Sequence, residues 1–174
     1  IFTGSAAAVT TPFTGRGVDF PALGKHLDFL LENGTDALVI CGTTGEAATM
    51  SYEERMEPVA AVVRHVDGRV PVIAGTGSNN TESAIALSRD AVSAGADGLL
   101  VVTPFYNKAT QRGLVRHFAA VADSVEKPVI LYNVPSRTGV KCTAETYAQL
   151  AGHPNIQGVK EASGDLALVE KTRE

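Results

Sequence analysis

The sequence predicts an α/β protein built on a parallel sheet, either a (β/α)₈ barrel or a doubly wound sheet. Short apolar segments alternate without interruption with longer amphipathic segments, which is the order of elements in repeated βαβ units. No linker, low-complexity stretch or block of like charges divides the chain, so we expect residues 1–174 to form one domain.

Six of the segments have the length and composition of strands in a parallel sheet. They are apolar almost throughout, because both faces of such a strand are covered. In chain order, the predicted strands are residues 5–9, 37–41, 70–75, 98–102, 129–132 and 156–160.

Helix signals stand between these strands. Asp19 caps a segment whose leucines recur at helical spacing, and Gly34 ends it. Ser51 and Glu54 form a capping box at the start of the next helical segment. Pro58 falls inside that helix beyond its first turn, and its missing N–H predicts a kink there.

Three later segments continue the alternation. Thr110 precedes a run with apolar residues on one helical face, and residues 143–152 have the pattern of a short helix. Residues 165–174 begin a sixth helix, whereas a complete (β/α)₈ barrel needs eight units and about 250 residues. We therefore expect the chain to cover the first six βα units of a barrel, and the natural protein to continue for about two more.

The composition argues against several classes of protein. The formal net charge is −4 and lysine and arginine do not cluster, so we expect no nucleic-acid partner. No stretch approaches the roughly 18 apolar residues of a membrane span, and no signal-peptide pattern opens the sequence. Cys41 and Cys142 are isolated and the histidines are scattered, which predicts neither a disulfide framework nor a metal site. The glycines of residues 75–80 do not follow the GxGxxG pattern, so we expect no nucleotide cofactor and no other cofactor. The charge, the isolated cysteines and the lack of a membrane span or signal peptide together place the protein in the cytoplasm.

Lys160 is the first candidate for chemistry. It ends the last predicted strand, where its amine either reaches solvent or is desolvated. Desolvation lowers the pKa of an amine, and a neutral amine can attack a ketone to form a Schiff base. The alternative is a lysine that extends into water and has no chemical role. In a barrel of only six strands we expect water to reach Lys160 and to weaken its activation.

Tyr132 lies near the end of the preceding predicted strand. The carboxyl ends of parallel strands carry the functional site in α/β folds, so Tyr132 and Lys160 should lie at the same end of neighbouring strands. A phenol beside an amine can relay the protons that imine chemistry moves. On its own, Tyr132 would fit a tyrosine of the core equally well.

Two loops at the same edge supply further candidates. Residues 41–46 read CGTTGE, in which two glycines allow a tight turn and the N–H groups and hydroxyls can hold an anion. Residues 103–107 read TPFYN and place a second tyrosine, Tyr106, at the same rim. An ordinary βα turn and a surface tyrosine would have the same composition.

Together these motifs resemble the dihydrodipicolinate synthase / N-acetylneuraminate lyase family of class I aldolases. The resemblance extends from Phe2 to Ala162, which is nearly the whole chain. It implies a TIM barrel in which Lys160 forms a Schiff base with pyruvate. It also implies a proton relay of Thr43, Tyr132 and Tyr106, with Tyr106 supplied by a neighbouring subunit.

The same resemblance implies the substrate-binding residues. Thr44, together with Thr43, would bind the pyruvate carboxylate through hydroxyl and N–H groups, and Gly45 belongs to the same loop. Residues 132–138, which read YNVPSRT, resemble the dihydrodipicolinate synthase branch, in which Arg137 holds the carboxylate of aspartate 4-semialdehyde. A guanidinium suits this role because it pairs with a carboxylate through two hydrogen bonds.

The implied reaction condenses pyruvate with aspartate 4-semialdehyde to 4-hydroxy-tetrahydrodipicolinate, a step toward diaminopimelate and lysine. Residues 1–174 would then be a partial TIM-barrel catalytic domain without strands 7 and 8 and the C-terminal helical region, and the full-length protein a homotetramer. Two alternatives stay open. A sugar-acid aldolase of the same family would not need residues 136–138, and a non-catalytic barrel fragment would not need its full set of candidate catalytic residues.

Overall fold

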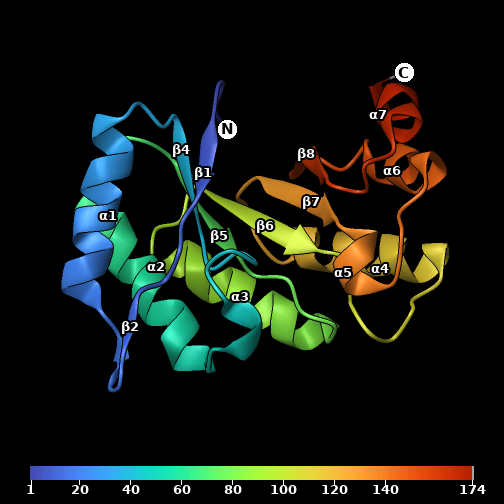
Figure 1. Cartoon of the computed structure of the whole chain (residues 1–174). Coiled ribbons are helices and arrows are strands. Elements are labelled where there is room, and N and C mark those ends of the chain that lie inside the picture. Colours follow the sequence, from blue (N-terminus) through green and yellow to red (C-terminus); the bar gives the residue numbers. More distant parts are fainter. Residues whose placement is uncertain (174) are drawn as a thin grey trace.

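The computed structural model describes residues 1–173, which form a curved parallel sheet with helices along its outer face (Figure 1). The six-stranded sheet has the order β1-β4-β5-β6-β7-β8, so each strand pairs with the next one along the chain. Its strands are β1 (Ala6–Ala8), β4 (Ala37–Ile40), β5 (Val72–Gly75), β6 (Gly98–Val102), β7 (Val129–Asn133) and β8 (Ile156–Glu161). A separate antiparallel pair consists of β2 (Phe13–Thr14) and β3 (Gly17–Val18).

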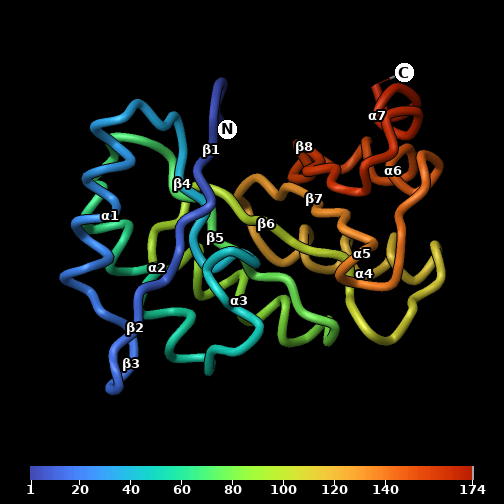
Figure 2. The backbone as a smooth tube through the Cα atoms, in the orientation of Figure 1, coloured from blue at the N-terminus to red at the C-terminus, as the bar shows by residue number. Residues whose placement is uncertain are grey.

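The helices follow one another around the sheet, as the backbone trace in Figure 2 shows. They are α1 (Phe20–Glu32), the short η1 (Ala47–Thr49), α2 (Tyr52–Val66), α3 (Thr81–Ser93), α4 (Gln111–Asp123), α5 (Pro135–Thr138), α6 (Ala144–Leu150) and α7 (Leu166–Arg173). The strand order never reverses, which distinguishes this half-barrel from a doubly wound sheet. Within residues 1–173, none of the helices combines the length and the apolar character needed to cross a membrane.

The six predicted strands are all present, each within two residues of its predicted bounds. The largest difference is at the start of β5, where Pro71 has no N–H to donate. The N–H of Val72 donates to the carboxylate of Asp97 at 2.9 Å. Helix α2 runs through Pro58, and the kink predicted there stays a prediction. The helix predicted at residues 165–174 is confirmed as α7, while Glu174 lies outside the described residues.

Apolar side chains pack on both faces of the sheet, which explains why its strands are apolar throughout. On β4, Leu38 belongs to the large cluster between the sheet and the helices, and Val39 belongs to a smaller cluster on the inner face. Leu131 and Tyr132 of β7 divide between the two clusters in the same way. This alternation follows from the two-residue period of a strand, and it directs Tyr132 to the inner face.

The predicted helix starts are confirmed in atomic detail. The carboxylate of Asp19 accepts from the N–H of Ala22 at 2.9 Å at the start of α1. At the start of α2, the N–H of Ser51 donates to the Glu54 carboxylate at 2.8 Å, and the N–H of Glu54 donates to the Ser51 hydroxyl at 3.2 Å. Thr110 caps α4 through its side chain. These bonds satisfy N–H groups that the helix itself cannot.

The register of the last three strands brings the candidate residues to one edge of the sheet. Val102 of β6 pairs with Tyr132 of β7, and Tyr132 pairs with Lys160 of β8. All three strands run in parallel, so their carboxyl ends and the loops that follow lie at the same edge. The prediction that Tyr132 and Lys160 share one end of neighbouring strands is confirmed.

Replacing Ser51 with alanine should lower the free energy of unfolding by about 1 kcal/mol, because the N–H of Glu54 loses its acceptor. Urea titration of the two proteins measures the difference. Ser51→Thr keeps a hydroxyl at the same position and should retain most of the stability. Equal losses in both variants would show that the capping bond is not what Ser51 contributes.

Candidate active site

Lys160 lies over the ring of Tyr132 on the inner side of the sheet. The strand register places the two residues opposite each other, and the Lys160 Nζ lies 4.5 Å from the centre of the Tyr132 ring. A cation in this position is attracted by the negative face of the ring, which holds the amine beside the tyrosine. The structure therefore brings the candidate nucleophile and a candidate proton donor together.

The two side chains differ in their access to water. Tyr132 is 7% exposed and packs in the inner-face cluster, whereas Lys160 is exposed. This confirms the expectation that water reaches Lys160 in a six-stranded half-barrel. Desolvation favours the neutral form of an amine, and the open inner face of the described residues leaves the Lys160 side chain in contact with water.

Two adjoining hollows meet at this pair. One has a volume of about 480 Å³ and is lined by Thr43, Tyr132 and Arg137, among others. Lys160 lines the other, together with inner-face residues of the sheet, and Leu100 lines both. Four of the predicted site residues thus surround one region at the carboxyl edge of the sheet.

The loop after β4 turns sharply and exposes its two threonines. Cys41 has a φ of 53°, in the left-handed region that is costly for any residue other than glycine. The N–H of Gly45 donates to the Gly42 carbonyl at 3.1 Å and closes the turn. Thr43 and Thr44 are exposed on this turn, and Thr43 lines the larger hollow. Backbone strain of this kind is characteristic of functional loops.

Gly45 contributes close packing beneath the loop. A Cβ at this position would lie 3.1 Å from both the Thr11 hydroxyl and the Val9 carbonyl. The Thr11 hydroxyl in turn donates to the Gly45 carbonyl at 2.7 Å. Because the Gly45 N–H is used inside the turn, its role in holding a substrate stays a prediction.

Arg137 is carried by α5, a single helical turn after β7. Pro135 opens the turn, and Gly139 ends it with a φ of 72° and an N–H that donates to the Pro135 carbonyl at 2.9 Å. The buried Thr138 hydroxyl donates to the Val134 carbonyl at 3.2 Å and fixes the turn from below. Arg137 itself is exposed and lines the larger hollow, where its guanidinium can meet an anion.

Tyr106 does not line the larger hollow, and neither do Thr44 and Gly45, while Lys160 lines the other one. The Tyr106 side chain is 88% exposed, and its φ of 71° is again in the left-handed region. The Tyr106 N–H donates to the Thr138 carbonyl at 3.2 Å, which ties this loop to α5. The action of Tyr106 in the site of a neighbouring subunit stays a prediction.

Comparison with known proteins shows the family. Residues 1–174 match the sequence profile of the dihydrodipicolinate synthetase family. The chain belongs to this family. A 4-hydroxy-tetrahydrodipicolinate synthase of Geobacter sulfurreducens is 58% identical over 166 residues, which are 95% of this chain and 57% of that protein. A second, of Thermoanaerobacter sp., is 54% identical over 97% of this chain and 57% of its own length.

Solved structures of the family have the same fold. A crystal structure of a dihydrodipicolinate synthase has a TM-score of 0.97 and 48% identity, and the match covers 98% of this chain and 60% of that one. The chloride-inhibited dihydrodipicolinate synthase from Acinetobacter baumannii, complexed with pyruvate, has a TM-score of 0.93 and 46% identity over 98% of this chain and 60% of that one. The chain thus spans 57–60% of the length of these relatives.

Arg55 is a site residue that the motifs of this family member did not reveal. It comes from α2, lines the larger hollow and donates from Nη2 to the Gly75 carbonyl at 3.0 Å. Burial lowers the pKa of its guanidinium from the ordinary value, while Cys41 and Tyr52 act in the opposite direction. No sequence motif indicates this contact, and only the folded structure shows that Arg55 joins α2 to the end of β5.

The groups gathered here are an amine, phenols, hydroxyls and guanidinium groups. Within the described part of the chain, residues 1–173, no three side chains of His, Cys, Asp or Glu gather in a way that could hold a metal ion.

Burial raises the pKa of the Cys41 thiol to about 11, against a smaller opposing effect of Arg55. The thiol therefore stays protonated at neutral pH and donates to the Arg55 carbonyl at 3.2 Å.

Replacing Gly75 with alanine should destabilise the fold by about 1–3 kcal/mol, because the chain ends of β4 and β5 approach too closely for a side chain. A Cβ at Gly75 would lie 2.1 Å from the Cys41 carbonyl oxygen. Gly152→Ala is the matched control, since a Cβ there meets nothing within 4 Å. Urea titration of both variants measures the effect, and equal stability of the two would contradict the close approach.

Proposed function

We propose that this chain is the part of a 4-hydroxy-tetrahydrodipicolinate synthase that carries the imine-forming lysine. The observation that supports this most is the position of the Lys160 amine over the Tyr132 ring, beside the hollow lined by Thr43 and Arg137. The names of the relatives support the same activity, and one solved relative is complexed with pyruvate. Residues 1–174 act in this proposal as a partial TIM-barrel catalytic domain.

The first half of the proposed reaction forms the imine. The neutral amine of Lys160 attacks the ketone carbon of pyruvate, and the resulting carbinolamine loses water to leave a C=N bond. Tyr132, whose ring lies beneath the amine, delivers the proton that the departing hydroxyl needs. Thr43 passes protons between Tyr132 and Tyr106 of a neighbouring subunit. Thr43 and Thr44 hold the pyruvate carboxylate, and Gly45 shapes their loop.

The second half joins the two substrates. Loss of a proton from the methyl carbon of the imine gives an enamine, whose carbon attacks the aldehyde of aspartate 4-semialdehyde. Arg137 binds the carboxylate of this second substrate through its two-pronged guanidinium. Attack of the substrate's own amino group on the imine carbon then releases Lys160 and closes the ring of 4-hydroxy-tetrahydrodipicolinate. The two substrates supply every atom of the product, and the side chains named above only carry protons.

The assembly and location of the protein belong to the same proposal. We place the reaction in the cytoplasm, where two isolated free cysteines such as Cys41 and Cys142 are ordinary. The strained and exposed Tyr106 supports a homotetramer, in which it would be buried against a neighbouring subunit. A monomeric dihydrodipicolinate synthase variant is among the solved relatives, at 40% identity, so subunit number varies among related chains.

Incubation with pyruvate and borohydride should add a reduced three-carbon adduct to Lys160 alone, because within residues 1–173 this amine lies over a phenol ring where the two hollows adjoin. Peptide mapping by mass spectrometry of the complete natural chain identifies the modified residue. Lys108 and Lys141 lie in the neighbouring loops and serve as internal controls. An adduct on either of them, with Lys160 unmodified, would overturn the assignment.

Arg137→Ala should reduce kcat/KM for aspartate 4-semialdehyde by about tenfold to a hundredfold, since a lost charged hydrogen-bond pair costs about 1.5–3 kcal/mol. Trapping of pyruvate on Lys160 should continue, because the first substrate does not use Arg137. Arg64→Ala removes an exposed arginine of α2 and provides the control. Unchanged kinetics with the semialdehyde would remove Arg137 from the site.

A further inference from the structure

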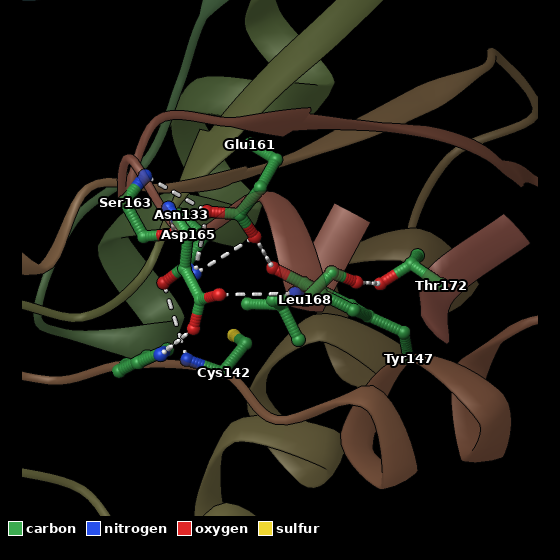
Figure 3. A network of polar contacts seen from close by, with 9 residues as sticks. Asn133, Cys142, Tyr147, Glu161, Ser163, Asp165, Leu168 and Thr172 are labelled. Atoms are coloured by element: carbon green, nitrogen blue, oxygen red, sulfur yellow. Dashed lines mark hydrogen bonds and ion pairs between the residues drawn. The ribbon is translucent and has the colours of Figure 1, made fainter. Parts of the chain in front are cut away.

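Glu161 follows Lys160 on β8, and its carboxylate is surrounded by hydrogen-bond donors (Figure 3). The Asn133 side-chain amide donates to both carboxylate oxygens, at 3.0 and 2.9 Å. The Tyr147 hydroxyl donates at 2.8 Å, and the Ser163 N–H donates at 2.9 Å. We call Glu161 and its three donors the Glu161 clamp.

The clamp holds an ionised carboxylate. Burial raises the pKa of Glu161, but the hydrogen bonds from Asn133, Ser163 and Tyr147 together outweigh it and keep that pKa below its ordinary value. Burial and the bond to Glu161 both raise the pKa of Tyr147, so its hydroxyl remains the donor. Bonds to a charged acceptor are roughly twice as strong as neutral ones, and this carboxylate receives several.

The clamp is anchored in the core and joins three elements. Asn133 on β7 is 1% exposed, and Tyr147 on α6 is 5% exposed. The side-chain oxygen of Asn133 accepts a hydrogen bond from the Cys142 N–H at 3.1 Å, and this second bond prevents the Asn133 side chain from rotating away from Glu161. Ser163 belongs to the segment after β8. The end of β8 is thereby fixed to its neighbouring strand, to a helix and to its own continuation.

Lys160 and Glu161 are adjacent on one strand, so their side chains leave it toward opposite faces. Lys160 lies on the inner face over Tyr132, and Glu161 meets the outer elements. A rotation of β8 about its own axis would move both side chains at once. Backbone pairing with β7 and the bond from Asn133 to Glu161 both hold β8 against that strand.

We infer that Glu161 is a positioning residue for Lys160. The clamp fixes the rotation of β8, and this rotation fixes the direction from which the Lys160 amine approaches its carbonyl partner. Asn133 and Tyr147 act through Glu161 and share this role. The inference rests on the proposed function, since it concerns the orientation of the imine-forming amine.

The first test exchanges donor and acceptor between two strands, in the complete natural chain. Asn133→Asp sets a carboxylate against Glu161 and should lower the rate constant of pyruvate imine formation, followed by borohydride trapping at saturating pyruvate, by about tenfold or more. The double variant Asn133→Asp with Glu161→Gln restores one donor and one acceptor. Its rate constant should return to within about threefold of the unsubstituted protein, as expected for coupled residues.

The second test uses two matched variants that each remove one phenol hydroxyl from a carboxylate partner. Tyr147→Phe takes a donor from Glu161, whereas Tyr52→Phe takes one from Asp90 between α2 and α3. Only Tyr147→Phe should slow imine formation. The pyruvate concentration at half-maximal rate should change little in either variant, because the loop at Thr43 is untouched.

The rate constant and the amplitude separate positioning from stability. A clamp that served stability alone would lower the amount of reactive protein and leave the rate constant of the folded fraction unchanged. Unchanged rate constants in Asn133→Asp and Tyr147→Phe would overturn the positioning role, as would a double variant as slow as Asn133→Asp. If the unsubstituted protein forms no adduct at Lys160, the proposed function fails and the positioning role fails with it.

Discussion

The pairing of β7 with β8 is the constraint on which the site depends. Residues opposite each other in a parallel pair share a face, so a single register sets both Tyr132 beside Lys160 and Asn133 beside Glu161. The first pair faces the inner hollow, and the second faces the helices. A slip of one residue would exchange the two faces, moving the amine into the outer layer and a carboxylate into the hollow.

The loops at the carboxyl edge place further side chains near Tyr132 and Lys160, and the backbone of these loops is locally strained. Cys41 adopts a left-handed backbone, and Gly75 must lack a side chain so that the Cys41 carbonyl can pass close to it. Arg55 links α2 to the Gly75 carbonyl and so braces the same region. The large outer cluster between sheet and helices offsets such strain, because burial of apolar surface is the main stabilising contribution.

What could be predicted from sequence was local or followed from parallel pairing. Capping by Asp19 and Ser51 depends on residues three positions apart, and the meeting of Tyr132 with Lys160 follows from a rule about strand ends. The roles of Arg55 and Glu161 could not be predicted in this way. Arg55 meets a carbonyl 20 residues away, and Glu161 meets an amide 28 residues away, so each depends on side-chain geometry that no periodic pattern encodes.

Orientation and desolvation of Lys160, the proposed nucleophile, are separate in this chain. The orientation of Lys160 is determined by nearby elements, since β7, β8 and α6 supply both the tyrosine and the Glu161 clamp. Its desolvation is not, because the Lys160 side chain is exposed on the inner face of the described residues. A cover over the inner face would lower the dielectric around an amine that is already aimed, and would thereby also strengthen its interaction with Tyr132. Closing the hollow would then change the surroundings of the proposed nucleophile without needing to move it.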